Sequence, residues 1–295
     1  MEVFLPNHPL AEVFGFPITN HSDLANRYRD HRLCPFNNRV PNCTKDKAND
    51  PLGVCSIYDD HNATVTCPIR FRENWLIAEH ASDFFFPKGA KWTSLTEVRI
   101  NDRNGRSAGN IDVVLVAYDE RGRILDFGSL EVQAVYISGN IRRPFEKFMN
   151  DSTVTDLDWT QEKNYPRPDY LSSSRKRLAP QMIFKGGILK AWKKKQAVAI
   201  DRGFYETLPS LKEVAKKDAD IAWLVYDLKL NEQRQAFDLT PHKTVYTEFD
   251  SALNQITKAE AGAVEDFIHH LQEKLDARLE GNSPEAPILG DIILS

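Results

Sequence analysis

Two apolar segments joined by a polar turn constrain the fold of this chain more than any other feature. Residues 111–118 (IDVVLVAY) and residues 130–135 (LEVQAV) are rich in Val, Leu, Ile and Ala, and such runs predict buried strands. The polar residues 119–123 (DERGR) predict the turn between them. Side chains two positions apart project from the same face of a strand, so Glu131 and Gln133 share one face.

The acids on these two strands suggest a metal site. Asp112 lies at the start of the first strand, and Glu131 lies near the start of the second. Two acids on neighbouring strands can hold a divalent cation, which favours a metal-dependent phosphodiesterase. Single acids in apolar strands are nevertheless common, and these residues alone favour a structural role. The nuclease hypothesis therefore depends on the rest of the chain.

The charge of the chain is unevenly distributed. The net charge is −4, yet the segment from Lys163 to Arg202 holds eleven Lys and Arg against the two acids Asp169 and Asp201, a local +9. A basic stretch in an acidic chain suits a surface that binds a polyanion such as DNA. The alternative is a solvated basic helix face, and both interpretations stay open.

Composition favours a cytoplasmic protein without membrane contact. With 295 residues, 41% of them hydrophobic, the chain suits one large domain or two modest ones. The longest apolar runs, residues 112–118 and 221–225, are far too short to span a bilayer. The first residues show neither a basic region nor an apolar core of the kind found in signal peptides.

Hydrophobic spacing predicts the remaining elements. We expect a helix start at residues 22–26, a short helix or strand at 72–82, helices at 185–199 and 208–217, and a buried strand at 221–226. We also expect a long amphipathic helix at 251–279, which favours a core helix, with a dimer contact as the alternative. Three prolines, at positions 166, 168 and 180, predict that residues 150–180 hold no long element.

The four cysteines of the chain lie within one short segment. They are separated by eight, eleven and eleven residues, in a stretch rich in Asn, Asp and Pro: Cys34, Cys43, Cys55 and Cys67. In a cytosolic chain this clustering favours a metal site over two disulfides. Four thiolates suit zinc or iron, and the metal would replace the apolar core that such a segment lacks. None of the gaps is as short as in a CxxC motif, so free structural thiols remain the alternative.

Around these cysteines the sequence resembles the four-cysteine module of NotI-type Type II restriction endonucleases. The similar segments are residues 34–38 (CPFNN), 42–45 (NCTK), 53–56 (GVCS) and 67–71 (CPIRF). The order also matches, because the acid-bearing strands follow the cysteines and the basic segment 168–177 (PDYLSSSRKR) follows the strands. The resemblance covers most of residues 30–230; it is specific in the cysteine segment and looser elsewhere.

The resemblance implies an α/β fold of the PD-(D/E)XK type, a mixed sheet flanked by helices. It implies a lead-in at residues 1–33, a four-cysteine metal module at 34–71 and a nuclease and DNA-recognition domain at 72–295. The module would hold iron in a structural role, with zinc as the alternative. The enzyme would be a homodimer that cuts double-stranded DNA at a GC-rich palindrome with a GGCC centre. We expect CGGCCG, because the chain is shorter than the eight-base-pair cutter that names the group.

The resemblance also assigns catalytic roles. Asp112 and Glu131 would hold Mg²⁺, and Gln133 stands where most of the superfamily carries lysine. Glu97 is a fourth candidate, as an acid on a helix before the first strand that reaches the metal or its water. The alternative for Glu97 is a capping box with Ser94, in which Glu97 stabilises only the start of that helix.

Sequence recognition would come from basic side chains that reach guanine edges in the major groove. The candidates lie in the basic stretch: Arg175, Lys176, Arg177, Arg167 and Lys185. The alternative for each of them is a phosphate contact that carries no sequence information.

The sequence therefore supports an Mg²⁺-dependent Type II restriction endonuclease. The competing function is a non-catalytic, sequence-specific DNA-binding regulator with a four-cysteine metal module, which the missing lysine at Gln133 motivates. A repair or RNA-processing nuclease on the same fold is a third, weaker alternative.

Overall fold

The computed structural model describes residues 8–37, 40–47, 49–153 and 158–281. The chain divides into two compact units, residues 1–257 and 258–295. The strands are β1 (Leu10–Val13), β2 (Phe16–Pro17), β3 (Asp46–Lys47), β4 (Asp50–Pro51), β5 (Val54–Asp59), β6 (Asn62–Val65), β7 (Trp92–Asn101), β8 (Ser107–Tyr118), β9 (Ile124–Gln133), β10 (Tyr136–Ser138), β11 (Arg167–Asp169), β12 (Gln196–Asp201), β13 (Ile221–Asn231) and β14 (Ala236–Thr247). The helices are α1 (Asp23–Asp30), η1 (Pro68–Trp75), α2 (Leu76–Phe85), α3 (Arg142–Asn150), α4 (Tyr170–Ser173), η2 (Ser174–Leu178), α5 (Ala179–Gln181), η3 (Met182–Gly186), α6 (Gly187–Ala191), α7 (Arg202–Glu206), η4 (Lys216–Asp218), α8 (Phe249–Thr257) and α9 (Val264–Gly281).

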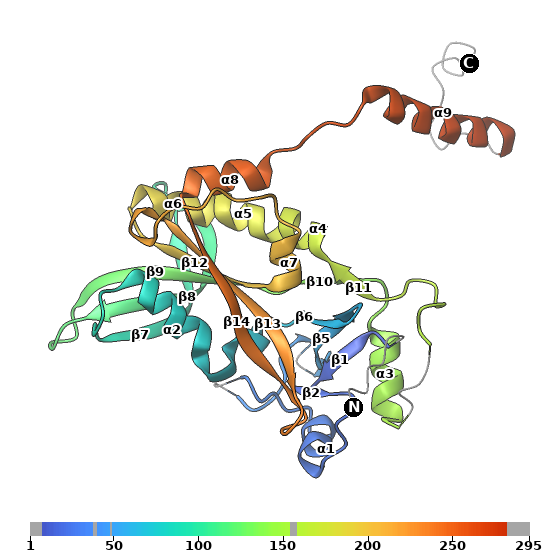
Figure 1. Ribbon diagram of the computed structural model, residues 1–295, viewed down its shortest axis with the longest axis horizontal. Helices are drawn as coiled ribbons and strands as arrows, with labels where there is room; N and C mark the ends of the chain where they lie inside the picture. Colours follow the sequence, from blue (N-terminus) through green and yellow to red (C-terminus); the bar gives the residue numbers. More distant parts are fainter. Residues whose placement is uncertain (1–7, 38–39, 48, 154–157, 282–295) are drawn as a thin grey trace. The chain divides into compact units, whose positions relative to one another are not determined.

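A six-stranded mixed sheet forms the centre of the first unit (Figure 1). Its strand order is β14-β13-β12-β9-β8-β7. Strand β12 pairs in parallel with both β13 and β9, while the outer pairs are antiparallel. The predicted strand pair is confirmed as β8 and β9, and the predicted buried strand at 221–226 is part of β13. At the turn, Asp119 Oδ1 accepts the backbone N–H groups of Arg121 and Arg123, each at 2.9 Å.

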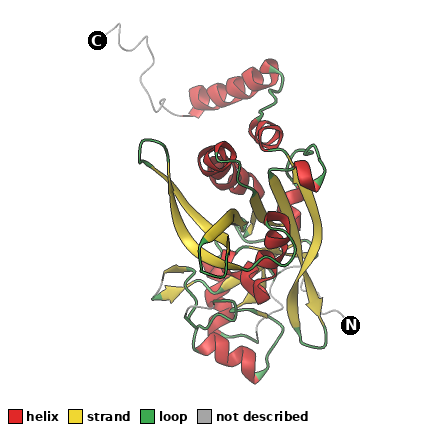
Figure 2. Ribbon diagram, turned by 90° about the vertical axis from the view of Figure 1, so that its left-hand side faces the viewer, coloured by secondary structure: helices red, strands yellow, loops and turns green. Residues whose placement is uncertain are grey.

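Helices cover both faces of this sheet (Figure 2). On one face, α2 packs against alternate buried residues of the strands, including Leu115, Leu130 and Val132. On the other face, buried residues of η2, η3 and α8 pack against Val198, Trp223 and Val225. This architecture confirms the mixed sheet flanked by helices that we predicted, and it is consistent with a restriction-endonuclease-like fold.

The segment 170–191 is one continuous helical stretch, although Pro180 predicted a break. Two π-helical turns, η2 and η3, lie on either side of Pro180. A proline interrupts the α-helical hydrogen-bond pattern because it lacks an N–H group, and π turns accommodate such interruptions. We call this stretch the 170–191 helix.

The expected helices at 185–199 and 208–217 are wrong in part. The first ends at Ala191, and after Lys193, which has a positive φ of 56°, the chain enters β12. All six residues of β12 are buried, and a strand buried on both faces reads as a continuous apolar run without alternation. Residues 208–215 form a loop, and only η4 begins within the second range.

A second, smaller sheet forms from the beginning of the chain. Its order is β2-β1-β5-β6, so β1 from the lead-in pairs with β5 from the cysteine segment. The predicted helix start is confirmed: Ser22 caps α1 by accepting the Ala25 N–H at 3.3 Å. The predicted domain limits at 33/34 and 71/72 stay a prediction.

The predicted long core helix at 251–279 is wrong in part, because the range is largely helical but is neither one helix nor buried throughout. The structure has two helices there, α8 and α9, with residues 258–263 between them. In α9, which belongs to the second unit, the apolar side chains are 48–67% exposed: Val264, Phe267, Ile268, Leu271, Leu275 and Leu279. Among the described helices, none has the length and apolar character required to cross a bilayer.

Candidate active site

Asp112 and Glu131 lie side by side on neighbouring strands. The register of β8 and β9 pairs Val113 with Leu130, and one further step in this register places Asp112 opposite Glu131. The backbone N–H of Val132 donates to Asp112 Oδ2 at 2.8 Å. Because Leu130 and Val132 face α2, the side chain of Glu131 points to the opposite face, which the 170–191 helix covers.

The carboxyl group of Glu131 is buried and unusual in its surroundings. The residue is 7% exposed, and its Oε2 accepts the Lys185 ammonium at 2.6 Å. Its Oε1 is buried and has no hydrogen-bond partner within the described part of the chain. Burial and the negative charge of Asp112 raise the pKa of Glu131 to about 7, against the opposing effect of Lys185. Two acids held together in this way repel each other.

Gln133 lies two residues after Glu131 on β9, and the two side chains therefore project from the same face of the strand. It is fully buried, and its Nε2 donates to Gln181 Oε1. Its Oε1 is buried and has no partner among the residues that the structure describes. A buried acceptor without a partner is uncommon in folded proteins, so this oxygen is a candidate acceptor of a hydrogen bond from a water molecule.

Glu97 lies in β7, and the helix that we expected around it is wrong. The pairs Thr96 with Val113 and Val98 with Ile111 place Glu97 across from Asp112 on the adjacent strand. The backbone of Glu97 has a positive φ of 57°. A non-glycine residue in this region in mid-strand is strained by about 1–3 kcal/mol, and such residues are frequent at active sites.

The donor chemistry of the acid pair fits a divalent cation. Asp112 and Glu131 supply carboxylate oxygens, which Mg²⁺ prefers, and Glu131 Oε1 has no competing partner within the described residues. A bound dication would also relieve the repulsion between the two acids. As they stand, no three Cys, His, Asp or Glu side chains among the described residues are close enough together to hold a metal ion.

The four cysteines form two backbone-linked pairs. The N–H of Cys34 donates to Pro41 O at 2.7 Å and that of Cys43 to Arg32 O at 2.9 Å, which joins their two segments. The N–H of Cys67 donates to Cys55 O at 3.2 Å. All four thiols are free.

Electrostatic effects connect the two cysteine pairs. Burial raises the pKa of Cys34 to about 11, and the nearby thiols of Cys67 and Cys43 add to this effect. Burial also raises the pKa of Cys55 well above its usual value, with Cys67 contributing. Lys45 donates to Val54 O at 2.6 Å and lies near three of the thiols. As placed, the four thiols form no group among the described residues that could hold a metal ion.

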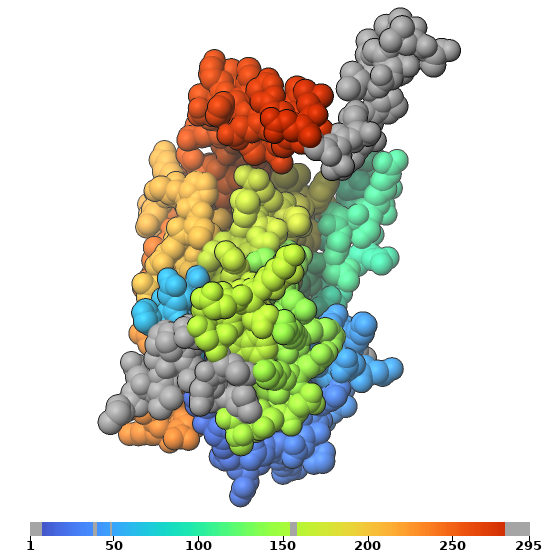
Figure 3. All heavy atoms as spheres, turned by 90° about the vertical axis from the view of Figure 1, so that its right-hand side faces the viewer, coloured from blue at the N-terminus to red at the C-terminus, as the bar shows by residue number. Residues whose placement is uncertain are grey.

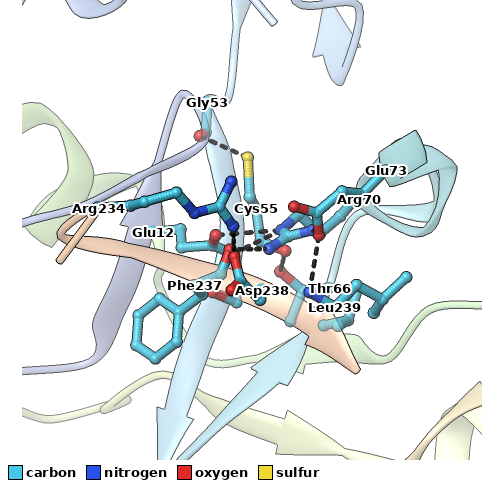
Figure 4. Close-up of polar contacts among 12 residues, drawn as sticks. Glu12, Gly53, Cys55, Thr66, Arg70, Glu73, Arg234, Phe237, Asp238 and Leu239 are labelled. Atoms are coloured by element: carbon cyan, nitrogen blue, oxygen red, sulfur yellow. Dashed lines mark hydrogen bonds and ion pairs between the residues drawn. The ribbon is translucent and has the colours of Figure 1, made fainter. Parts of the chain in front are cut away.

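A buried ion-pair network joins the cysteine segment to the central sheet (Figure 4). Glu12 of β1 accepts from Arg70 Nε at 3.0 and 3.1 Å, and both side chains are fully buried. Arg70 also bonds Glu73 at 2.8 Å and the Phe237 carbonyl of β14 at 2.9 Å. Burial alone would lower the pKa of Arg70, but the carboxylates of Glu12 and Glu73 hold it above its usual value. This network is structural and lies beside Cys55.

A comparison with known families identifies the fold. The family described as restriction endonuclease NotI matches residues 12–239, which is more than half of the chain and includes both the cysteines and the acid pair. The chain belongs to the NotI family of restriction endonucleases. No curated protein matches it. Family membership implies a site-specific nuclease, a hydrolase that binds double-stranded DNA.

The five basic residues singled out in the sequence separate into two groups in this NotI-family protein. Arg167, Arg175 and Lys176 are exposed and Arg177 is partly exposed, on a segment that lies at the surface in Figure 3 (yellow-green). Lys185 is only 4% exposed and bonds Glu131. It therefore belongs to the candidate active site and not to the exposed basic surface.

Sequence reasoning missed Gln181 altogether and did not connect Lys185 with the acids. The only available signal was their spacing of four residues in a helical stretch, which places both on one face. Nothing in the sequence pairs that face with Glu131 and Gln133, because about fifty residues separate them along the chain.

Proposed function

We propose that this protein is an Mg²⁺-dependent Type II restriction endonuclease that hydrolyses phosphodiesters of duplex DNA at a GC-rich palindrome. The observation that carries the proposal is the acid pair of partly buried Asp112 and buried Glu131, which a six-stranded mixed sheet presents in a NotI-family chain. A palindrome with a GGCC centre, such as CGGCCG, is the substrate we expect from the family resemblance.

Asp112 and Glu131 would hold the metal. When bound, Mg²⁺ would lower the pKa of a water molecule and neutralise charge on the scissile phosphate. The Val132 N–H fixes the orientation of Asp112, and Lys185 fixes that of Glu131. The free Oε1 of Gln133 would accept a hydrogen bond from the attacking water and orient it. Glu97 would act as a further acid beside Asp112, on the strand next to it.

Recognition would depend on the exposed basic residues Arg167, Arg175, Lys176 and Arg177. Arginine and lysine contact guanine O6 and N7 in the major groove more often than other side chains do. A palindromic site calls for a protein with two-fold symmetry, so we propose a homodimer. The exposed apolar face of α9 is one surface that a second copy could cover.

We further propose that the four cysteines hold a structural iron, with zinc as the alternative. The proximity of Cys67 to the other three thiols and the neighbouring cation of Lys45 support this proposal. Elemental analysis of protein purified without chelators tests it directly, because one iron or one zinc per chain is expected.

Digestion of duplex DNA of known sequence tests the enzymatic proposal. Discrete fragments that require both Mg²⁺ and Asp112 are the expected result, and the mapped ends would give the site. Specific binding without cleavage, and without any effect of Mg²⁺, would instead establish the DNA-binding regulator. A preference for single-stranded or structured substrates would indicate a repair or RNA-processing nuclease.

A further inference from the structure

We propose that Lys185 is the catalytic cation of this active site and contacts the scissile phosphate from the 170–191 helix. It would thereby supply the charge that Gln133 lacks. This inference rests on the proposed nuclease function. It assigns a catalytic role to a residue that lies 54 positions after Glu131 and outside the Glu131–Val132–Gln133 segment of β9.

The position of Lys185 favours this role. Its ammonium donates to Glu131 Oε2 at 2.6 Å and to the Asn110 carbonyl at 2.8 Å. An ammonium has three donors, and within the described part of the chain these two acceptors account for two of them. The third donor is therefore available to a phosphate oxygen that approaches Asp112 and Glu131.

The fold brings Lys185 and position 133 to the same place. Gln181 and Lys185 are four residues apart on the helix, a spacing that puts them on one face. Gln181 bonds Gln133, while Lys185 bonds Glu131. Residues 131 and 133 are about 7 Å apart along a strand, and residues 181 and 185 are about 6 Å apart along a helix. A lysine at 133 and the lysine at 185 would thus reach into the same space.

The local backbone holds Lys185 firmly. It lies in the π-helical turn η3, and π turns are frequent at functional sites. The next residue, Gly186, is pressed against α8, since a Cβ there would approach the Phe249 ring to 2.7 Å. A well-fixed cation stabilises developing charge without reorganisation during the reaction.

The competing explanation is that Lys185 is only the counter-ion of Glu131. Four variants separate the two roles: K185M, K185R, the double variant Q133K/K185M, and K190M as the matched control. Lys190 lies on the same helical stretch and bonds Asp220 at 2.6 Å, the same distance as in the active-site pair. It contacts none of the acids of the candidate site.

Cleavage under single-turnover conditions with saturating duplex DNA and Mg²⁺ is the first measurement. K185M should lose at least about 100-fold in rate, the usual loss when one electrostatic donor is removed from an active site. K190M should cleave like the wild type. Q133K/K185M should regain about tenfold or more over K185M, because the new lysine restores the charge. Binding of the same DNA with Ca²⁺ should change by less than about threefold in K185M.

Binding of Tb³⁺ or Mn²⁺ to the protein without DNA is the second measurement, and it does not depend on activity. Lys185 competes with a metal for Glu131 Oε2, so K185M should bind the metal more tightly while cleaving more slowly. A lysine that served only as the counter-ion of Glu131 would give tighter metal binding without slower cleavage, and loss of structure would weaken both. Thermal melting of each variant confirms that it is folded.

Different outcomes of these measurements would overturn the inference about Lys185 and the proposed nuclease function. If the wild type cuts DNA and K185M cuts it within about threefold of that rate, Lys185 is not the catalytic cation. Lys185 is also not the catalytic cation if Q133K/K185M cleaves as slowly as K185M and K185R is inactive, provided that Q133K/K185M and K185R remain folded. If the wild type leaves DNA intact with Mg²⁺, the proposed function itself fails, and this inference fails with it.

Discussion

Replacing Arg70 with methionine should destabilise the protein more than any surface substitution. The guanidinium of Arg70 is fully buried and bonds two carboxylates, Glu12 and Glu73, and the carbonyl of Phe237 (Figure 4). In Arg70→Met, Glu12 remains in the interior with Ser56 Oγ, at 2.8 Å, as its other hydrogen-bond partner among the described residues. The carboxylate would therefore be left largely uncompensated.

The size of the loss follows from this geometry. Breaking a buried ion pair by removing one partner costs about 3–5 kcal/mol, because a charge stays buried without its partner. In a unit of this size a loss of 1 kcal/mol lowers the melting temperature by about 2–4 °C, so a decrease of about 6–20 °C is expected. The double variant Glu12→Gln/Arg70→Met should be about 2 kcal/mol more stable than Arg70→Met, because it removes the orphaned charge.

Urea denaturation followed by circular dichroism measures these differences. Arg32→Met is the matched control, since Arg32 bonds Asp50 at 2.8 Å with both side chains about half exposed; this pair should contribute less than about 1 kcal/mol. The reasoning is refuted if Arg70→Met loses no more than Arg32→Met. It is also refuted if the double variant is no more stable than Arg70→Met, because the cost would then not come from the buried charge of Glu12.

Three further predictions follow from the sites described above. Asp112→Asn should reduce Mg²⁺-dependent cleavage by about 1,000-fold or more, because a ligand of the proposed metal is lost. The same variant should raise the free energy of unfolding by about 1 kcal/mol, since Asn still accepts the Val132 N–H and no longer repels Glu131. Cleavage assays and urea denaturation of one preparation test both expectations. If the four cysteines hold a metal as proposed, Cys67→Ser should lower the iron or zinc content measured by elemental analysis, whereas Ser56→Ala should leave it unchanged. Burial raises the pKa of Asp201 from 3.8 to about 7, so the folded protein binds this proton more tightly and loses up to about 4 kcal/mol of stability as the pH rises from about 4 to above 7. Asp201→Asn should flatten this dependence between pH 5 and pH 8, and an unchanged slope in urea denaturation would contradict the assignment.

Local patterns predicted the acid pair well because the interaction is local. Asp112 and Glu131 lie on two strands that a short turn connects, so the pairing follows once both strands are recognised. Glu97 lies on the next strand, but a capping-box pattern with Ser94 suggested a helix instead. The alternation of apolar and polar residues from Val98 to Asn101 is the sequence signal for a strand there, since period two is a property of strands and not of helices.

The parallel strand β12 and the role of Lys185 could not be predicted from local patterns. In β12 the short run QAVAID begins only five residues after the end of a helix, and buried parallel strands lack the alternation that marks other strands. Lysine is almost never buried without a partner, so the sequence alone groups Lys185 with the exposed basic residues. Its partner, Glu131, is distant in sequence, and only the packing of the 170–191 helix on β9 brings the two together.

The acid pair and its lysine also explain why the site is built on rigid elements. A sheet that places two carboxyls next to each other without a metal must offset their repulsion. Here Lys185 does so in part, and burial raises the pKa of Glu131 to about 7 so that a proton can do the rest. Under the proposed function, Mg²⁺ held by Asp112 and Glu131 would offset the repulsion instead, and it would compete with Lys185 for Glu131. Lys185 would stay close to the acids because its backbone lies in η3, and the proposed contact with a DNA phosphate requires that position.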